Sequence, residues 1–253
     1  GLVIPGIIGD RQELVGKNLE IFNEAVANGI IVPDRGLTLP GRDMTERWYT
    51  TTNPYLAEIS GAEQVVADFV EQAKDPSSPN KPLMLDVLIS RVVLETAPKT
   101  TLAGLQGIYG DTYHLQREVI EDAHALAAVI DACGKTGNGD IGATLCLRSS
   151  HDIDRAWEIT RQHRVRVIEA VKSARMHEGI AGVYEVKDAT VQSDVADILS
   201  HDIPTTGPVL VYAKNGEVCR ISARSPAGTR IELGPKVREL AAACGGNGGG
   251  HNL

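Results

Sequence analysis

The residues best suited to chemistry lie near the end of the chain, where Gly245-Gly246-Asn247-Gly248-Gly249-Gly250-His251 contains five glycines. Glycine adopts positive φ without a steric cost, so successive N–H groups of such a loop can turn toward one anion. The histidine that follows can hydrogen-bond or protonate a phosphate oxygen. The pattern predicts a phosphate site at Gly248, Gly249, Gly250 and His251, and a frayed glycine tail is the plainer interpretation.

The segment before this loop carries more side chains that can bind phosphate: Ser222, Arg224 and Ser225. The apolar run 208–213 and the Asn-Gly pair at 215–216 predict a β-hairpin, with 218–225 as its second strand. A helix is expected from 234 to 244, because Pro235 suits the first helical turn and apolar residues recur at three- and four-residue spacing. We expect the strand, the helix and the loop to form one compact unit.

A candidate carboxylate stands near the start of the chain, where the apolar run 2–8 is followed by Gly9 and Asp10. Catalytic carboxylates are often found where a buried element meets a loop, because the scaffold then holds them in place. A helix or turn cap is the alternative role for an isolated Gly-Asp pair.

A further candidate is the glycine-rich stretch 134–139, in which Lys135 offers a cation for phosphate. Lysine binds phosphate as a point charge, in contrast to the bidentate fork of arginine. Asp131, four residues earlier, would disfavour a polyanion. The stretch is not a P-loop, because the G-x-x-x-x-G-K-[ST] spacing is absent, and an ordinary glycine-rich turn is the alternative.

The most basic stretch is 155–175, which holds six basic and two acidic side chains. Val165, Ile168 and Val171 recur at a spacing of three, which indicates a helix with one packed face. Such a helix can line a groove that follows a nucleic-acid strand, and a solvated helix face is an equally good interpretation. Trp157 is the one aromatic residue nearby, so we expect contacts with phosphate more than base stacking.

Apolar periodicity predicts the remaining elements. Helices are expected at 18–25, 64–73, 83–94 and 118–130. Short strands are expected at 29–32 and 37–41, on either side of a Pro-Asp-Arg-Gly turn.

Composition limits the class of protein. The 253 residues include 25 Lys and Arg against 33 Asp and Glu, a net charge of −8, which excludes a uniformly basic surface but permits a local basic groove. The four cysteines form no C-x-x-C pair, so neither a zinc site nor a disulfide framework is indicated. No apolar stretch approaches the length of a membrane span and no signal-peptide pattern is present, so we expect a cytoplasmic protein without a membrane partner.

Several of these segments resemble the DHH family of phosphoesterases. The strand 221–225, the helix and the Gly-Gly-x-Gly-Gly-Gly-His loop look like the family's DHH-associated domain. The segment 6–12 resembles the one that supplies the last metal-binding aspartate of RecJ-like members. The order of segments up to Gly61, and Asp-Ala-Cys-Gly-Lys at 131–135, resemble the archaeal RecJ-like branch, which often has Asn and Arg at the positions of Asp131 and Lys135.

The resemblance implies metal-dependent hydrolysis of phosphodiester bonds. Two divalent ions, Mn²⁺ or Mg²⁺, would activate a bridging water, with Asp10 as one metal ligand. The substrate phosphates would be bound by Ser222, Arg224, Ser225, Gly248, Gly249, Gly250, His251 and Lys135. The family's Asp-x-Asp and Asp-His-His motifs are absent from 1–253. Most metal ligands are therefore expected upstream of Gly1, and the chain alone is expected to be inactive.

The same resemblance implies an α/β protein of two parts. Residues 1–110 would be the end of a DHH catalytic domain with a helical connection. Residues 111–253 would be an α/β DHH-associated domain that binds nucleic acid or phosphate, truncated at its C-terminus. The implied partners are single-stranded DNA or RNA and, in replication, the GINS complex.

Three functions remain open at this point. The first is a single-strand-specific exonuclease of the archaeal RecJ-like kind, acting in DNA replication or repair. The second is a DHH phosphodiesterase for short oligoribonucleotides or cyclic dinucleotides, and the third is a non-catalytic replication scaffold. The long middle region with its Asp-Ala-x-Gly-Lys stretch favours the first.

Overall fold

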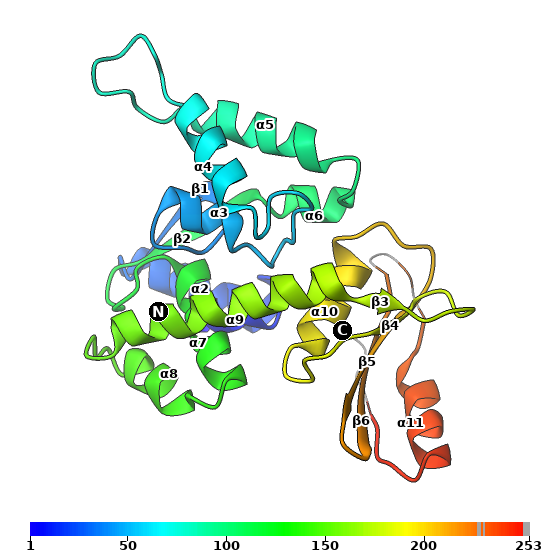
Figure 1. Ribbon diagram of the computed structural model, residues 1–253. Helices are drawn as coiled ribbons and strands as arrows, with labels where there is room; N and C mark the ends of the chain where they lie inside the picture. The colour runs from blue at the N-terminus through cyan, green and yellow to red at the C-terminus, as the bar shows by residue number, and fades with distance from the viewer. Residues whose placement is uncertain (227–228, 230, 250–253) are drawn as a thin grey trace.

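A computed structural model describes residues 1–226, 229 and 231–249, and within them the protein is a mixed α/β fold with two separate sheets (Figure 1). The long helix α9 (Ile153–Ser173) runs through the middle of the molecule. Its first half lies beside α7 (Ala123–Lys135) and α8 (Gly139–Cys146), and its second half leads to the C-terminal sheet. The basic stretch at 155–175 is therefore a helix, as the sequence predicts.

The N-terminal elements are α1 (Val3–Gly9), α2 (Gly16–Ala27) and the strand β1 (Ile31–Leu37). The helix expected at 18–25 is confirmed in α2. The prediction of two strands around a turn is wrong, because β1 continues through Pro33 and pairs antiparallel along its whole length with β2 (Tyr109–Leu115). Each strand of this two-stranded sheet keeps one unpaired edge, and an edge strand tolerates a proline that lacks an N–H donor.

A helical region lies between these two strands and projects from one end of the molecule (Figure 1). It contains α3 (Met44–Tyr49), α4 (Glu63–Gln72), α5 (Leu85–Thr96) and α6 (Leu102–Gln106), and α4 and α5 confirm two predicted helices. Its apolar centre, here called the Trp48 core, includes Leu39, Trp48, Leu56, Ile59, Leu88 and Ile108.

The second apolar centre, here called the α7 core, packs α7 against its neighbours and includes Ile4, Ile31, Leu115, Leu126, Leu145 and Ala156. Helix α7 begins at 123 and not at 118, so that part of the helix predicted at 118–130 is wrong. The Asp122 carboxylate accepts hydrogen bonds from the N–H groups of His124 (2.9 Å) and Ala125 (3.1 Å). An aspartate in this position satisfies backbone donors of the first turn and fixes where the helix starts.

The C-terminal sheet has the strand order β3-β4-β5-β6, with β3 (Arg175–Met176), β4 (Val183–Glu185), β5 (Val209–Asn215) and β6 (Val218–Arg224). Helix α10 (Gln192–His201) connects β4 to its parallel neighbour β5, and α11 (Gly234–Ala243) follows β6. The third apolar centre, here called the sheet core, joins α9, α10 and β5 and includes Val167, Ile168, Val195, Ile198, Val209 and Val211.

The predicted hairpin is confirmed as β5 and β6, but its turn lies one residue later than expected. Asn215 pairs with Val218, so Gly216 and Glu217 are the two loop residues, and Gly216 has φ +61°. A type I′ turn needs positive φ at both loop positions, and Glu217 does not have it. Glycine therefore occupies the first loop position, where a left-handed backbone is required.

The expected division at 110/111 falls inside β2, which pairs with β1 on both sides of that point. The α7 core also combines residues from 4 to 31 with residues from 115 to 156. Packing therefore does not separate the chain at this position. Among the described residues, no helix is both long and apolar enough to cross a lipid bilayer.

Candidate functional site

Asp10 is exposed at the C-cap position of α1, where its N–H donates to the Gly6 carbonyl at 3.0 Å. Its carboxylate accepts a hydrogen bond from the Gln12 amide at 3.5 Å. Residues 1–226, 229 and 231–249 contain no group of three or more His, Cys, Asp or Glu placed to hold a metal ion. Asp10 therefore belongs to no such group within these residues, and its role as a metal ligand stays a prediction.

The start of the glycine loop ends helix α11. Gly245 has φ +71° and donates to the Ala242 carbonyl, while Gly246 donates to the Ala241 carbonyl at 2.8 Å. This pair of bonds is a common way to satisfy the last carbonyls of a helix. Gly248 then returns so close to α11 that a Cβ atom there would lie 2.9 Å from that of Ala241. These glycines have a structural reason for being glycine, independent of any ligand.

The remaining candidates of this region stay predictions. Gly249 has open space around it, so a side chain would fit there. Gly250 and His251 lie outside the described residues. The Ser225 hydroxyl donates to the Ile231 carbonyl at 3.0 Å and ties the segment after β6 back toward the strand.

The structure brings Lys135, Ser222 and Arg224 to a single helix, α10, although they are far apart in sequence. The Lys135 ammonium, at the end of α7, lies 2.6 Å from the Asp194 carboxylate in the first turn of α10. It also lies 2.8 Å from the Asp131 carboxylate of its own helix. Burial lowers the pKa of Lys135, but Asp194 and Asp131 outweigh burial, and the net effect is a raised pKa.

Ser222 and Arg224, on β6, contact the same end of α10. The Gln192 amide donates to the Ser222 hydroxyl at 3.1 Å. The Arg224 guanidinium donates to the Ser193 hydroxyl at 3.0 Å and forms a short ion pair with Asp197. Three of the predicted phosphate ligands thus surround one helix, and both cations among them are already paired with carboxylates.

Two buried polar atoms at this helix find no hydrogen-bond partner within the part of the chain that the structure describes: Nδ1 of His163, on α9, and Oε1 of Gln192, on α10 itself. His163 is 5% exposed, and its Nε2 lies 3.7 Å from the Asp194 carboxylate. Burial lowers the pKa of His163, Asp194 acts to raise it, and Lys135 acts to lower it, with a lowered pKa as the result. The imidazole is therefore held in its neutral form inside a charged neighbourhood.

An open depression of about 450 Å³ lies on the adjoining surface of α9. We call it the arginine depression; it is lined by Thr136, Asn138, Ile159, Arg161, Gln162, Val165 and Arg166. No carboxylate lines it. This hollow lies between α9 and the residues that follow Lys135, and the strand-binding groove expected along the basic helix stays a prediction.

The two arginines of this depression differ in their partners. Arg161 donates to the Glu158 carboxylate through both Nε (2.9 Å) and Nη2 (2.7 Å), and the Gln162 amide donates to the same carboxylate. These bonds lower the pKa of Glu158 to about 2. Arg166 is exposed and makes no ion pair or side-chain hydrogen bond with any residue that the structure describes. Of the two arginines, Arg166 is therefore the more available to an anionic ligand.

A second depression, of about 400 Å³, lies at the N-terminal part of α9. We call it the tryptophan depression; it is lined by Gly41, Arg42, Arg47, Val119, Ile120, Glu121, Asp122, Ala125, Ile153 and Trp157. The Arg47 guanidinium lies 3.2 Å from the Asp122 carboxylate. Gly41 has to be glycine here, because a Cβ atom would lie 2.6 Å from the Arg47 backbone nitrogen.

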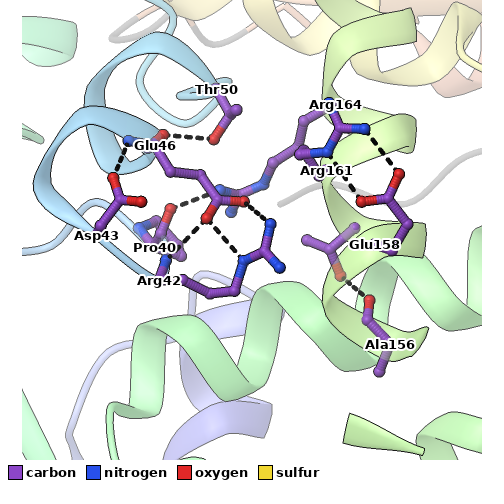
Figure 2. Close-up of polar contacts among 10 residues, drawn as sticks. Pro40, Arg42, Asp43, Glu46, Thr50, Ala156, Glu158, Arg161 and Arg164 are labelled. Carbon is purple, nitrogen blue, oxygen red and sulfur yellow. Dashed lines mark hydrogen bonds and ion pairs between the residues drawn. The ribbon is translucent and has the colours of Figure 1, made fainter. Parts of the chain in front are cut away.

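Buried polar contacts fix the wall between the α3 region and α9 (Figure 2). The Glu46 carboxylate is 6% exposed and accepts hydrogen bonds from the Arg42 backbone N–H and guanidinium. Arg164 crosses from α9 and donates to the Pro40 carbonyl at 2.7 Å. Burial lowers the pKa of Arg164 to about 10, with Glu46 and Asp131 acting in the opposite direction.

The sequence did not indicate Asp194, Asp197, Arg42 or Glu46 as parts of these sites. Each is a charged residue on a short element that shows its importance only once the chain is folded. Arg164 is the exception, because it lies three residues from Arg161 and two from Arg166 in a stretch already singled out as basic. Its position four residues before the apolar Ile168, on the same face of the helix, was the available signal that this arginine is buried.

Comparison with known proteins gives limited information. No family model matches the chain. An uncharacterized protein of Methanocaldococcus jannaschii is similar to it, with 26% identity over 267 residues. That similarity covers 100% of this chain and 57% of the relative, so the chain spans little more than half the length of the protein it matches.

Proposed function

We propose that this chain binds the phosphate backbone of single-stranded DNA or RNA, as part of a metal-dependent phosphodiesterase of the RecJ-like DHH kind. The observation that carries the proposal is the gathering of Lys135, Ser222 and Arg224 on α10, because the resemblance assigns phosphate binding to all three. In this proposal the remaining metal ligands belong to the part of a longer protein that this chain does not span. The length of the archaeal relative leaves room for such a part.

The surface that carries Arg166, Lys135 and Arg224 can bind phosphate in two ways. Arg166 has an unoccupied guanidinium fork, which matches the oxygens of a phosphate group. Lys135 and Arg224 are held by Asp194 and Asp197, so a phosphate has to replace a carboxylate at each of them. Such an exchange replaces one anion by another and gains little electrostatic free energy. Arg166 is therefore expected to provide most of the affinity.

Replacement of Arg166 by alanine tests this assignment. Fluorescence anisotropy of a labelled oligothymidylate of twelve nucleotides would measure binding at several salt concentrations. We expect Arg166→Ala to lower the affinity about tenfold, since a charge-assisted hydrogen bond contributes roughly 1.5–3 kcal/mol. The slope of log affinity against log salt should fall by about 1, because one phosphate contact is lost.

Arg91→Ala is the matched control for this experiment. Arg91 lies on α5 with its guanidinium 4.5 Å from the centre of the Phe69 ring, and it borders neither depression. The Arg91→Ala substitution removes the same charge as Arg166→Ala, but away from both depressions. The affinity and salt slope of this variant should therefore match those of the unchanged chain. Equal effects of the two substitutions would mean that only net charge matters, and the proposed site would be wrong.

Competition separates a long strand from a short substrate. If the surface follows a strand, a twelve-nucleotide oligomer should displace the label at a far lower concentration than a dinucleotide. Equal competition per molecule would favour the phosphodiesterase for short oligoribonucleotides or cyclic dinucleotides. The chain alone, incubated with Mn²⁺, is expected to bind the strand without cutting it, and hydrolysis under these conditions would contradict the expected location of the metal ligands.

A different observation favours the replication scaffold as a second candidate. Exposed apolar side chains occur on α1 and α2 and just before them: Leu2, Val3, Val15, Leu19 and Ile21. Large exposed apolar surfaces often mark sites of protein association. If the chain fails to bind oligonucleotides at low salt, a scaffold that docks on proteins such as the GINS complex becomes the better proposal.

A further inference from the structure

The tryptophan depression combines features that the arginine depression lacks. Trp157 is half-buried, so part of its indole faces the hollow while the rest packs against the α7 core. Arg42 is exposed on the opposite wall, and the carboxylates of Glu121 and Asp122 also line the hollow. Arginine planes and indole faces both stack on flat aromatic ligands. Arg42 and Arg47 line the same hollow, so the formal charges of its lining cancel and give a phosphate no net attraction.

The two depressions border neighbouring turns of α9 and have no lining residue in common. Trp157 and Arg161 are one turn apart on α9, and Glu158 lies between them in sequence and holds Arg161. Arg42 comes close enough from the other wall for Glu158 to raise its pKa and for Arg161 to lower it, although the hydrogen bond from Arg42 to Glu46 has the larger effect. Figure 2 shows Arg42, Glu46, Glu158 and Arg161 facing one another across this wall. Arg161 of the arginine depression and Trp157 of the tryptophan depression are therefore neighbours on the surface of α9.

We infer that the tryptophan depression binds a nucleobase of the strand whose phosphates lie along the arginine depression. The inference rests on the proposed function, because it needs a strand on α9. The base stacks on the indole of Trp157, and Arg42 covers the opposite side of the hollow. Because the formal charges of this lining cancel, the hollow does not attract the phosphate backbone, and the strand presents a base there. The arginine depression, with no carboxylate in its lining, takes the backbone.

Tryptophan fluorescence can test this inference, because the two tryptophans of the chain lie in different environments. Trp48 is fully buried in its own core, whereas Trp157 lines the depression. Oligothymidylate of twelve nucleotides should therefore quench the emission of Trp157 and leave that of Trp48 unchanged. An abasic strand with the same number of phosphates should bind through the arginine depression without this quenching. In the Trp157→Leu variant, where Trp48 is the one remaining indole, neither strand should alter the emission.

Affinity gives a second, independent readout. Trp157→Leu keeps an apolar side chain against the α7 core and removes the stacking face, so binding of oligothymidylate should weaken about tenfold. Binding of the abasic strand should stay the same. Trp157→Phe retains a ring and should lose less affinity than Trp157→Leu. Because the quenching measurement uses the unchanged chain, the inference can be judged even if a variant does not fold.

The outcomes separate this inference from the proposed function. If oligothymidylate and the abasic strand bind equally well and Trp157 is not quenched, the nucleobase site is wrong while phosphate binding stands. If neither strand binds, both are wrong. If oligothymidylate binds tenfold more tightly than the abasic strand and Trp157→Leu removes that difference, the nucleobase site is supported.

Discussion

Arg161 and Arg164 lie less than one turn apart on α9, yet their environments predict opposite results on replacement. Arg164 is 8% exposed and hydrogen-bonds the buried Pro40 carbonyl, so Arg164→Ala leaves both a cavity and an unsatisfied acceptor. We expect a loss of about 2–4 kcal/mol in the free energy of unfolding, measured by urea denaturation. Arg161→Ala breaks a pair at the surface and should cost less than about 1 kcal/mol.

The comparison of these two variants controls for the loss of a positive charge on α9. Similar stability of both would show that the contact from Arg164 to Pro40 does not hold the α3 region against α9. Arg164→Met offers a further check, because it fills most of the space but donates no hydrogen bond. Its stability should lie between that of Arg164→Ala and that of the unchanged chain.

His163 is expected to make the stability of the protein depend on pH. Its pKa in the folded state is lowered by burial, with Asp194 and Asp131 opposing and Lys135 and Arg166 adding to the effect. The unfolded chain, with a histidine pKa of about 6.5, then binds more protons than the folded chain just below that pH. The contribution of neutral His163 to the free energy of unfolding should be fully present above about pH 6.5. It should be lost as the pH falls from there toward the lowered pKa.

Urea denaturation at pH 7, 6 and 5 would measure this decline, and His163→Gln should make it shallower. His151→Gln is the matched control, since His151 is exposed in the loop before α9 and should leave the slope unchanged. Asp188, whose own pKa is lowered, is a further charged group near His163 and is present in every variant. If the free energy of unfolding falls with pH equally steeply in His163→Gln and in the unchanged chain, the carboxylates and not His163 cause the pH dependence.

At the scale of elements, α10 determines how the predicted cations behave. Its first turn places Asp194 against Lys135, so a phosphate has to compete with this carboxylate. Asp194→Asn should raise the affinity for oligothymidylate about fivefold, because an ion pair of this kind contributes about 1 kcal/mol. Asp68→Asn on α4 changes the net charge equally, away from the site, and should have no effect. A weaker affinity in Asp194→Asn would mean that Asp194 positions Lys135 for binding.

Local patterns in the sequence predicted where the helices and strands lie better than they predicted which elements pair or pack with one another. Helices α2, α4, α5, α9 and α11 and the hairpin β5–β6 follow from apolar periodicity and turn residues close to one another in the chain. Strand β1 was missed because its pairing with β2 joins residues more than seventy positions apart, and no local signal reports that. Phosphate binding by Lys135, Ser222 and Arg224, which the sequence suggested, stays a prediction. The carboxylates that neutralise the two cations come from a crossover helix whose placement depends on the whole sheet.

At the scale of the whole molecule, α9 connects all three apolar centres. Ala156 lies in the α7 core, Val167 and Ile168 lie in the sheet core, and Arg164 contacts the segment that leads into the Trp48 core. We therefore expect one cooperative unfolding transition. Ile168→Ala, at a side chain that is 2% exposed, should lower the free energy of unfolding by about 2–5 kcal/mol.

The fluorescence of Trp48 can test whether the three apolar centres unfold together. In a Trp157→Phe background the remaining indole is Trp48, which belongs to a different apolar centre from Ile168. The urea midpoint from Trp48 fluorescence and that from far-UV circular dichroism should move together when Ile168→Ala is added. If the Trp48 midpoint stays in place while the circular dichroism midpoint falls, the helical region between β1 and β2 unfolds on its own.

The carboxylates that hold Lys135, Arg161 and Arg224 also have a consequence for kinetics. A surface on which these three cations are already neutralised, on a protein of net charge −8, produces little long-range attraction for a polyanion, even with Arg166 unpaired among the described residues. We expect strands to arrive at the unsteered rate of about 10⁵–10⁶ M⁻¹ s⁻¹. Each carboxylate remains beside its cation and can recapture it as soon as a phosphate leaves, so residence times should be short. Such a surface is suited to repeated capture and release along a strand.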